Sequence, residues 1–217
     1  MVKIRYASPL WDEVLMVENF RYTRELCKAT EKYHVDRYDI EHPTRRYEYP
    51  FILRNLKSES NLKILDAGGG GSVLGLYLAE HHTVTNLDAD QPTITQMDLI
   101  AKEFNLNYRA LLGHIEKMDF PADSFDATIC VSVLEHLSKE KMKKAIDDFL
   151  FVTRKKVLIT MDISEDIPDL PNLDFVKSLM WPYKMDNGSI MSFPIEGIPG
   201  HISIVYLTFE KENDGSP

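Results

Sequence analysis

Hydrophobic residues recur along this chain with two different periods. Up to about Leu56, apolar side chains are spaced as on helices, and no stretch resembles a strand. We expect short helices in this part, over residues 8–20, 19–33 and 43–56. Ser8 and Pro9 are suited to starting the first of them. Pro50 is expected to kink the last.

After Leu62, short apolar runs alternate with amphipathic stretches. The expected strands are residues 62–67, 82–88, 107–113, 125–133 and 155–163, and the expected helices are 72–80, 92–104 and 138–152. Strands that alternate with helices predict a mainly parallel sheet with helices on both faces. After Asp162 the alternation ends. Residues 189–195 and 201–210 then predict an antiparallel hairpin at the edge of an α/β fold.

Composition and charge narrow the classes of partner. The formal net charge of −9 argues against nucleic acid as the main partner, because such proteins usually present a basic face. No apolar window approaches the length of a membrane span, so we expect a soluble cytoplasmic protein without a membrane partner. We expect it to be a monomer or a homodimer. Cys27 and Cys130 indicate neither a disulfide framework nor a zinc site, and no spacing resembles a metal triad.

Four consecutive glycines, Gly68 to Gly71, follow the first expected strand. In an open parallel sheet, ligands bind beyond the carboxyl ends of the strands, where the glycines lie. A tight turn needs one or two glycines, so four predict that something flat and large rests on this loop.

Two classes of cofactor use such a loop. The dinucleotide fingerprint ends in a small residue, but both registers here end in bulky ones, Val73 and Leu74. A wider register that ends at Gly75 keeps a nicotinamide cofactor open. Asp66, two residues before the first glycine, favours S-adenosylmethionine, because a carboxylate there can receive the ammonium of that cofactor.

Asp88 ends the second expected strand, 22 positions after Asp66, where the ribose of an adenosine would lie. Its two oxygens can accept from both ribose hydroxyls. Nicotinamide sites use the same device, so Asp88 supports an adenosine without choosing between the cofactors. A solvated loop carboxylate is the alternative.

Over Leu62 to Asp162 the chain resembles the class I S-adenosylmethionine-dependent methyltransferases, of the small stand-alone kind shared with ubiquinone-pathway enzymes. The first motif reads "LDAGGGGS", with Ser72 where many members have a glycine. The resemblance implies a three-layer Rossmann-like methyltransferase fold. It also implies that Gly68, Gly69 and Gly70 back the methionine part of the cofactor, that Asp88 holds the ribose, and that Ala89 lies near the adenine.

Two further motifs carry the resemblance. "LLGHIEKMDFPADSFD" places His114 where many members have Asp beside adenine, with Ile115 on the ring and Glu116 as a replacement polar contact. "FDATICVSVLEHL" implies that Val131 and Ser132 lie beside the methionine end of the cofactor and that the following residues line the methyl-transfer site.

His136, with Glu135 beside it, is the candidate general base, since imidazole titrates near neutrality. A structural histidine at this turn is the alternative.

The resemblance also implies an N-terminal helical cap, assigned to residues 1–57, over a core of residues 58–217 within one structural domain. In that cap Arg45 is a candidate clamp for the cofactor carboxylate, or part of a solvated basic turn.

Residues near the end of the chain are candidates for the acceptor pocket: Asp162, Trp181, Tyr183 and Met185, of which the last three also suit core filling. The leading hypothesis is a methyltransferase that uses S-adenosyl-L-methionine on a small-molecule acceptor. A nicotinamide-dependent oxidoreductase and a non-catalytic cofactor-binding or scaffold protein are the alternatives.

Overall fold

An eight-stranded sheet forms the centre of the molecule in a computed structural model, which describes residues 4–6, 13–36, 38–167, 169–180, 187–194 and 201–210. The spatial order of the strands is β1-β7-β8-β6-β5-β2-β3-β4. The strands are β1 (Ile4–Tyr6), β2 (Lys63–Ala67), β3 (Thr83–Asp88), β4 (Tyr108–Leu112), β5 (Phe125–Val131), β6 (Thr153–Ile163), β7 (Asn187–Pro194) and β8 (His201–Glu210). All neighbours pair in parallel except β8, which is antiparallel to both β6 and β7.

The strand order reverses between β2 and β5. From β2 the chain proceeds outward through β3 to β4, and it then returns to the other side of β2 to form β5 and β6. The carboxyl ends of β2 and β5 therefore border the crevice in which open α/β sheets bind ligands.

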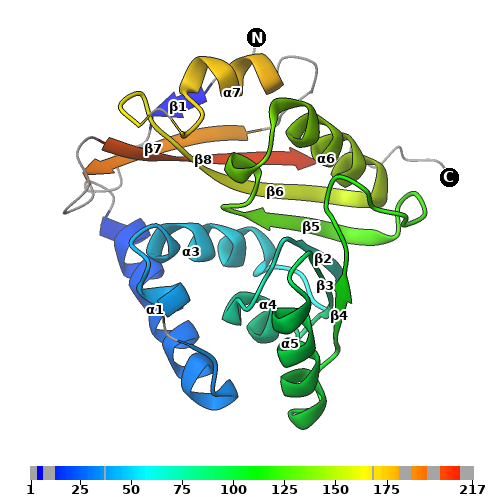
Figure 1. Ribbon diagram of the computed structural model, residues 1–217. Helices are drawn as coiled ribbons and strands as arrows, with labels where there is room; N and C mark the ends of the chain where they lie inside the picture. The colour runs from blue at the N-terminus through cyan, green and yellow to red at the C-terminus, as the bar shows by residue number, and fades with distance from the viewer. Residues whose placement is uncertain are drawn as a thin grey trace, which may run out of the picture.

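Helices cover both faces of the sheet. They are α1 (Glu13–Tyr33), α2 (Tyr38–Glu41), α3 (Arg45–Leu56), α4 (Val73–Leu78), α5 (Gln91–Glu103), α6 (Lys139–Val152), α7 (Leu173–Met180) and a single 3₁₀ turn, η2 (Leu134–His136). Figure 1 shows α1, α3, α4 and α5 on one side of the sheet and α6 and α7 on the other. The result is a three-layer α/β fold, as the sequence predicts.

The central strands are buried on both faces, which explains their unbroken apolar character. In β2, Ile64 belongs to the core beneath α1, α3 and α4, while the next residue, Leu65, belongs to the core beneath α6. Both side chains are fully buried. Adjacent residues of a strand point to opposite faces, so a strand between two helical layers must be apolar throughout.

Side-chain caps set the starts of the core helices close to their predicted positions. Ser72 accepts a hydrogen bond from the backbone of Leu74 at the start of α4, and Asp90 accepts one from Thr93 at the start of α5. Such caps satisfy backbone N–H groups that have no partner within the helix.

Two expectations about the N-terminal part need correction. The short strand β1 pairs with β7, although no strand was expected before Leu56. Its three residues are too few to show a period of two. The two helices expected over residues 8–33 are one helix, α1, from Glu13 onward; Ser8 and Pro9 lie outside the described residues. Helix α3 includes Pro50, and the kink expected there stays a prediction. The C-terminal hairpin is confirmed as β7 and β8.

The N-terminal helices pack directly on the core. Helices α1 and α3 share one apolar cluster with α4 and with β2. Tyr77 of α4 donates a 2.8 Å hydrogen bond to Glu25 of α1, and Tyr33 of α1 donates to Glu80 at the end of α4. These contacts hold α1 and α3 beside the glycine loop. The division at residue 57 into cap and core stays a prediction.

Candidate functional site

A cavity of about 310 Å³ opens at the carboxyl ends of β2 and β5, and we call it the glycine-loop cavity. Its walls come from the loop after β2, from the turn after β5 and from α3. The lining residues are Asp36, Arg45, Tyr49, Asp66, Gly68, Gly69, Gly70, Gly71, Ser72, Leu74, Val131, Ser132 and Val133. The structure therefore brings most of the predicted methionine-end residues together in one place, along with Arg45.

Two of the four glycines adopt backbone conformations that other residues avoid. Gly68 has φ +77° and Gly70 has φ +51°. A Cβ on Gly68 would also stand 2.7 Å from the side chain of Val133. A Cβ on Gly70 would meet only Asp88 Oδ2, at 3.7 Å, so this glycine leaves open space on the loop.

Gly69, the second of the four glycines, leaves space for a side chain behind the loop. A Cβ there would stand 2.5 Å from Asp66 Cγ and 2.8 Å from Asn86 Oδ1. At Gly71, in contrast, a Cβ would make an ordinary contact of 3.4 Å with Thr93. Gly68 and Gly69 are thus required by the packing of the protein itself, and Gly70 by its backbone conformation. The number of glycines alone is therefore weaker evidence for a ligand than the sequence suggested.

Asp66 lies at the end of β2 and supports the loop from behind. Its side chain is only 3% exposed and packs against Gly69 and Gly75. Beside it, Asn86 donates hydrogen bonds to the carbonyl oxygen of Gly70 (2.8 Å) and to Tyr108 Oη (2.7 Å). Burial, together with the nearby Asp66 carboxylate, raises the pKa of the Tyr108 phenol.

Asp88 connects the end of β3 to the glycine loop. Its Oδ2 accepts a 2.9 Å hydrogen bond from the amide of Gly70, and its Oδ1 accepts one from the amide of Asp90. Each oxygen keeps a second lone pair for a ligand hydroxyl. Ala89 is exposed beside it. The half-buried Asp88 is therefore held in place for the role that the sequence predicts, which stays a prediction.

The predicted adenine contacts lie apart from the glycine-loop cavity. His114 is exposed and Ile115 is buried, and neither lines the cavity. Glu116 forms a 2.9 Å ion pair with Lys141 of α6, and this hydrogen bond lowers the pKa of the Glu116 carboxyl. Its carboxylate is engaged with α6. The expected replacement contact to adenine stays a prediction.

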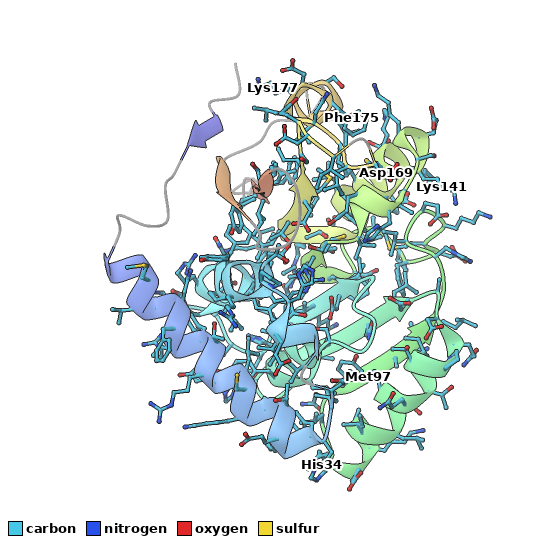
Figure 2. The ribbon with its side chains drawn as sticks, turned by 60° about the vertical axis from the view of Figure 1, so that its left-hand side comes forward. His34, Met97, Lys141, Asp169, Phe175 and Lys177 are labelled. Atoms are coloured by element: carbon cyan, nitrogen blue, oxygen red, sulfur yellow. The ribbon has the colours of Figure 1, made fainter. Side chains whose placement is uncertain are left out.

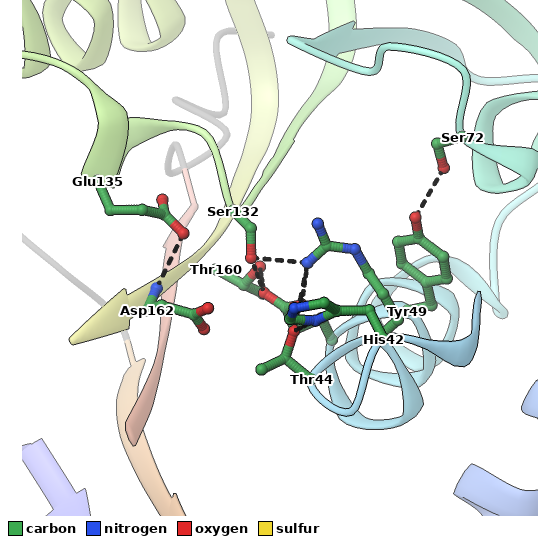
Figure 3. Close-up of polar contacts among 10 residues, drawn as sticks. His42, Thr44, Tyr49, Ser72, Ser132, Glu135, Thr160 and Asp162 are labelled. Carbon is green, nitrogen blue, oxygen red and sulfur yellow. Dashed lines mark hydrogen bonds and ion pairs between the residues drawn. The ribbon is translucent and has the colours of Figure 1, made fainter. Parts of the chain in front are cut away.

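A network of polar side chains joins α3 to the turn after β5. Arg45 Nη1 donates a 2.7 Å hydrogen bond to Ser132 Oγ and pairs with Glu48 one turn along α3. Ser132 and Thr160 each donate a 2.6 Å hydrogen bond to Glu48 Oε1. Figure 3 shows these contacts converging between the labelled Ser132 and Thr160. Ser132 has φ +49°, a conformation that few non-glycine residues adopt.

The sequence interpretation missed Glu48, which is fully buried. The sequence feature that could have identified Glu48 is its spacing of three residues from Arg45, which places the two side chains on the same face of a helix. Tyr49 was missed as well. Its hydroxyl lies 2.9 Å from Ser72 Oγ, so α3 is bonded to the glycine loop at the residue that caps α4.

Two carboxyl groups lie next to this network. Glu135 Oε1 accepts a 3.2 Å hydrogen bond from the backbone amide of Asp162. Burial, with the nearby Asp162 and Glu48, raises the pKa of Glu135 to about 8. Burial, with the nearby Glu48, raises that of Asp162 to about 7. His136, the expected base, is exposed and does not line the glycine-loop cavity.

A second and larger cavity, of about 1020 Å³, lies between α1 and the start of α3, and we call it the apolar cavity. Its lining includes the exposed side chains Met16, Val17 and Phe20 of α1, with Arg46 and Tyr47 of α3. The first turn of α3 thus lines both cavities. Trp181, Tyr183 and Met185, which were expected near an acceptor, lie outside the described residues.

Among the described residues, no group of three or more His, Cys, Asp or Glu side chains could hold a metal ion. In the same part of the chain, no helix is both long and apolar enough to cross a membrane. Cys27 and Cys130 are free thiols, and Cys130 is buried.

The parallel strands with their reversal at β2 and β5, the antiparallel β8 and the glycine-loop cavity match the Rossmann-like fold of the class I methyltransferases. Residues 64–156 match the family model described as "Methyltransferase domain". The matched segment supplies both the glycine loop and the turn after β5. A comparison with curated proteins gives no match.

Solved structures of this fold resemble the chain over most of its length. The YcgJ protein from Bacillus subtilis is 14% identical, covering 76% of this chain and 98% of its own, with a TM-score of 0.61. A SAM-dependent methyltransferase from Aquifex aeolicus is 14% identical, with coverages of 84% and 97% and a TM-score of 0.55.

The third structure is 1,6-didemethyltoxoflavin-N1-methyltransferase from Burkholderia thailandensis, with bound 1,6-didemethyltoxoflavin and S-adenosylhomocysteine. It is 15% identical, with coverages of 97% and 93% and a TM-score of 0.62. At these identities the likeness concerns the fold.

Proposed function

We propose that this protein transfers the methyl group of S-adenosylmethionine to a small-molecule acceptor. The observation that carries the proposal is the glycine-loop cavity itself, which combines an open glycine loop with charged groups of both signs. Arg45 and Asp66 line the cavity, and Asp88 is hydrogen-bonded to the loop amide of Gly70. The matched methyltransferase segment, residues 64–156, provides all of these groups except Arg45.

The residues of the cavity fit the chemical groups of this cofactor. Asp66 offers a carboxylate to the ammonium of the methionine part, and the guanidinium of Arg45 can hold the carboxylate of that part bidentately. The free lone pairs of Asp88 suit the ribose hydroxyls. Space at Gly70, where a Cβ would meet nothing closer than 3.7 Å, lets a ligand approach the backbone.

The bound cofactor supplies a methyl group already activated by the positive sulfur. What remains for the chain is to position the reactants and to exclude water, which can supply roughly 7–11 kcal/mol of the barrier. The bonds from Arg45 to Ser132 and from Tyr49 to Ser72 fix α3 against both walls of the cavity. These residues therefore keep the walls at a fixed separation.

A small-molecule acceptor is supported by three observations. The apolar cavity is large enough for a small organic molecule, and it shares the first turn of α3 with the glycine-loop cavity. The net charge of −9 disfavours a nucleic acid. The Burkholderia enzyme of the same fold holds a small-molecule acceptor together with S-adenosylhomocysteine.

Calorimetric titration with S-adenosylhomocysteine and with NADH tests the cofactor. We expect saturable binding of S-adenosylhomocysteine and none of NADH, and the opposite pattern would replace this proposal with an oxidoreductase. Asp88→Ala should weaken the binding of S-adenosylhomocysteine. The control is Asp119→Ala, which removes an exposed carboxylate and should bind like the wild type. Transfer of a labelled methyl group to a metabolite pool tests catalysis, and silence despite binding would favour a scaffold.

A further inference from the structure

Asp162 and Glu135 lie at the carboxyl end of the sheet, on the side of β5 and β6. Asp162 follows Thr160 by two residues on β6, so both side chains point to the face that α3 covers. Glu135 comes from η2, directly after the turn that lines the glycine-loop cavity. Figure 3 shows the Glu135 side chain directed toward the backbone of Asp162.

Each of these two carboxyl groups has an oxygen without a partner. Glu135 is only 7% exposed, and its Oε2 is buried with no hydrogen-bond partner. The same is true of Asp162 Oδ1, although the Asp162 side chain as a whole is partly exposed. Leaving a buried polar atom without a partner is unfavourable, and more so for a charged group. A ligand that donates hydrogen bonds to this pair would remove the cost.

The charges around the pair favour a cation as that ligand. Glu48 adds a third carboxylate, and Arg45 is the cation that acts on Asp162. The guanidinium of Arg45 is already paired with Glu48 and hydrogen-bonded to Ser132. Among the described residues, neither carboxyl group forms an ion pair of its own, and their raised pKa values agree with that deficit.

Neither carboxyl group lines the glycine-loop cavity or the apolar cavity, but residues next to them do. Glu135 itself lines a separate pocket together with Lys139 and Phe175. On the glycine-loop side, Ser132 lines the cavity and shares Glu48 with Thr160. On the other side, Asp162 pairs in register with Ile204 of β8. Tyr47, which lines the apolar cavity, packs on the Ile204 and Tyr206 cluster. A molecule with its polar end at Asp162 can thus place an apolar body along Tyr47.

We propose that the methyl acceptor is an amine with an apolar body, whose nitrogen is bound by Asp162, and that Glu135 positions Asp162 for this contact. The inference rests on the proposed methyltransferase function and adds the substrate class. Asp162 contacts the acceptor. Glu135 acts through it, by accepting the backbone N–H of Asp162.

The reaction balances as follows. The bound ammonium gives one proton to the Asp162 carboxylate, which frees the lone pair of the nitrogen. That lone pair attacks the methyl carbon, so the N–C bond forms while the S–C bond breaks and sulfur keeps its electron pair. The products are a methylated ammonium and an uncharged thioether, and Asp162 then releases its proton to solvent.

Matched probes test the substrate class on the protein loaded with S-adenosylhomocysteine. A panel of amines is titrated, each with its isosteric alcohol and carboxylate, for example 2-phenylethylamine, 2-phenylethanol and 3-phenylpropanoate. We expect amines to bind at least tenfold more tightly than their isosteres. Asp162→Asn should remove this preference and leave the Kd of S-adenosylhomocysteine unchanged. Asp169 and Phe175 (Figure 2) line one pocket with Glu135, so the control is taken elsewhere. Asp119→Asn makes the same charge change at an exposed position outside that pocket and should change neither.

The role of Glu135 has its own readout, with an amine found in that panel as substrate. Glu135→Gln keeps an oxygen for the Asp162 amide and should keep kcat within about threefold of the wild type. Glu135→Ala should lower kcat at least tenfold at an unchanged cofactor Kd. A merely structural residue would lower the unfolding midpoint in both variants and leave kcat of the folded protein unchanged.

The outcomes separate this inference from the proposed function. If S-adenosylhomocysteine fails to bind, the proposed function is wrong and the inference falls with it. If it binds but no amine does, or if alcohols or carboxylates bind as well as their amine isosteres, the substrate class is wrong and the proposed function stands. Retention of amine preference by Asp162→Asn would also overturn the inference.

Discussion

Two neighbouring glycines of the loop should respond oppositely to the same substitution. In Gly69→Ala the new methyl group would stand 2.5 Å from Asp66 Cγ and 2.8 Å from Asn86 Oδ1. In Gly71→Ala it would meet Thr93 Cγ2 at 3.4 Å, an ordinary van der Waals distance. Neither glycine has a positive φ, so backbone strain does not separate the two variants.

The destabilisation expected for Gly69→Ala follows from the space available behind the loop. Asp66 is 3% exposed and Asn86 is fully buried, so neither side chain can move away without disturbing its neighbours. Overpacking of this kind costs about 1–3 kcal/mol. For a chain of this length that lowers the unfolding temperature by roughly 2 to 12 °C. Gly71→Ala should instead stabilise the protein, by about 0.4–1 kcal/mol, because alanine restricts the unfolded chain.

Urea unfolding and calorimetric titration with S-adenosylhomocysteine, on both variants, check the prediction. Gly69→Ala should lower the midpoint and weaken binding at least tenfold, because displacement of Asp66 also moves the loop amides. Gly71→Ala should keep the affinity of the wild type. Equal midpoints for the two variants would refute the packing that the structure assigns to Gly69.

Other predictions concern the charged groups. Arg45→Met should destabilise the protein by about 3–5 kcal/mol, since Glu48 would stay buried without its cation, and adding Glu48→Met should restore most of the loss. Because the folded-state pKa of Glu135, about 8, exceeds its usual 4.5, the folded protein holds a proton that the unfolded chain releases. Stability should therefore fall between about pH 4.5 and pH 8, by on the order of 5 kcal/mol, and Glu135→Gln should flatten this fall. Asp88→Ala should weaken S-adenosylhomocysteine binding at least tenfold, or about 1.4 kcal/mol.

Each of these has a contradicting result. An additive loss in the Arg45 and Glu48 double variant, measured by urea unfolding, would show that the two residues do not act as a pair. Identical pH dependence of unfolding in the wild type and Glu135→Gln would place the titration elsewhere. An unchanged Kd in Asp88→Ala would show that the ribose lies away from β3.

The core of the fold was predictable because its signals are local and repeated. The apolar runs at β2 and β5 are buried on both faces, and Ser72, Asp90 and Ser138 cap helices where the pattern changes. Strand β1 was not predictable in the same way. Its three residues gain a partner only from β7, about 180 positions later in the chain, and no local period reports such a pairing.

The site residues that lie at the ends of strands were predictable. Asp66, the glycine loop and Ser132 follow from strand ends, whose position the pattern fixes. The Glu48 network was not, because it depends on how α3 docks across β5 and β8. His136 was selected for its chemistry, but the turn of η2 leaves it exposed, while the adjacent Glu135 points inward to Asp162. Tertiary packing decides which of these two adjacent side chains points inward, and the sequence pattern does not report it.

The most direct test of the central claim is a crystal structure of this protein with S-adenosylhomocysteine. The account predicts the ligand in the glycine-loop cavity, with its carboxylate at Arg45, its ribose hydroxyls at Asp88 and its sulfur beside Ser132 and Val133. An empty cavity at saturating ligand, or a ligand bound elsewhere on the molecule, would contradict it.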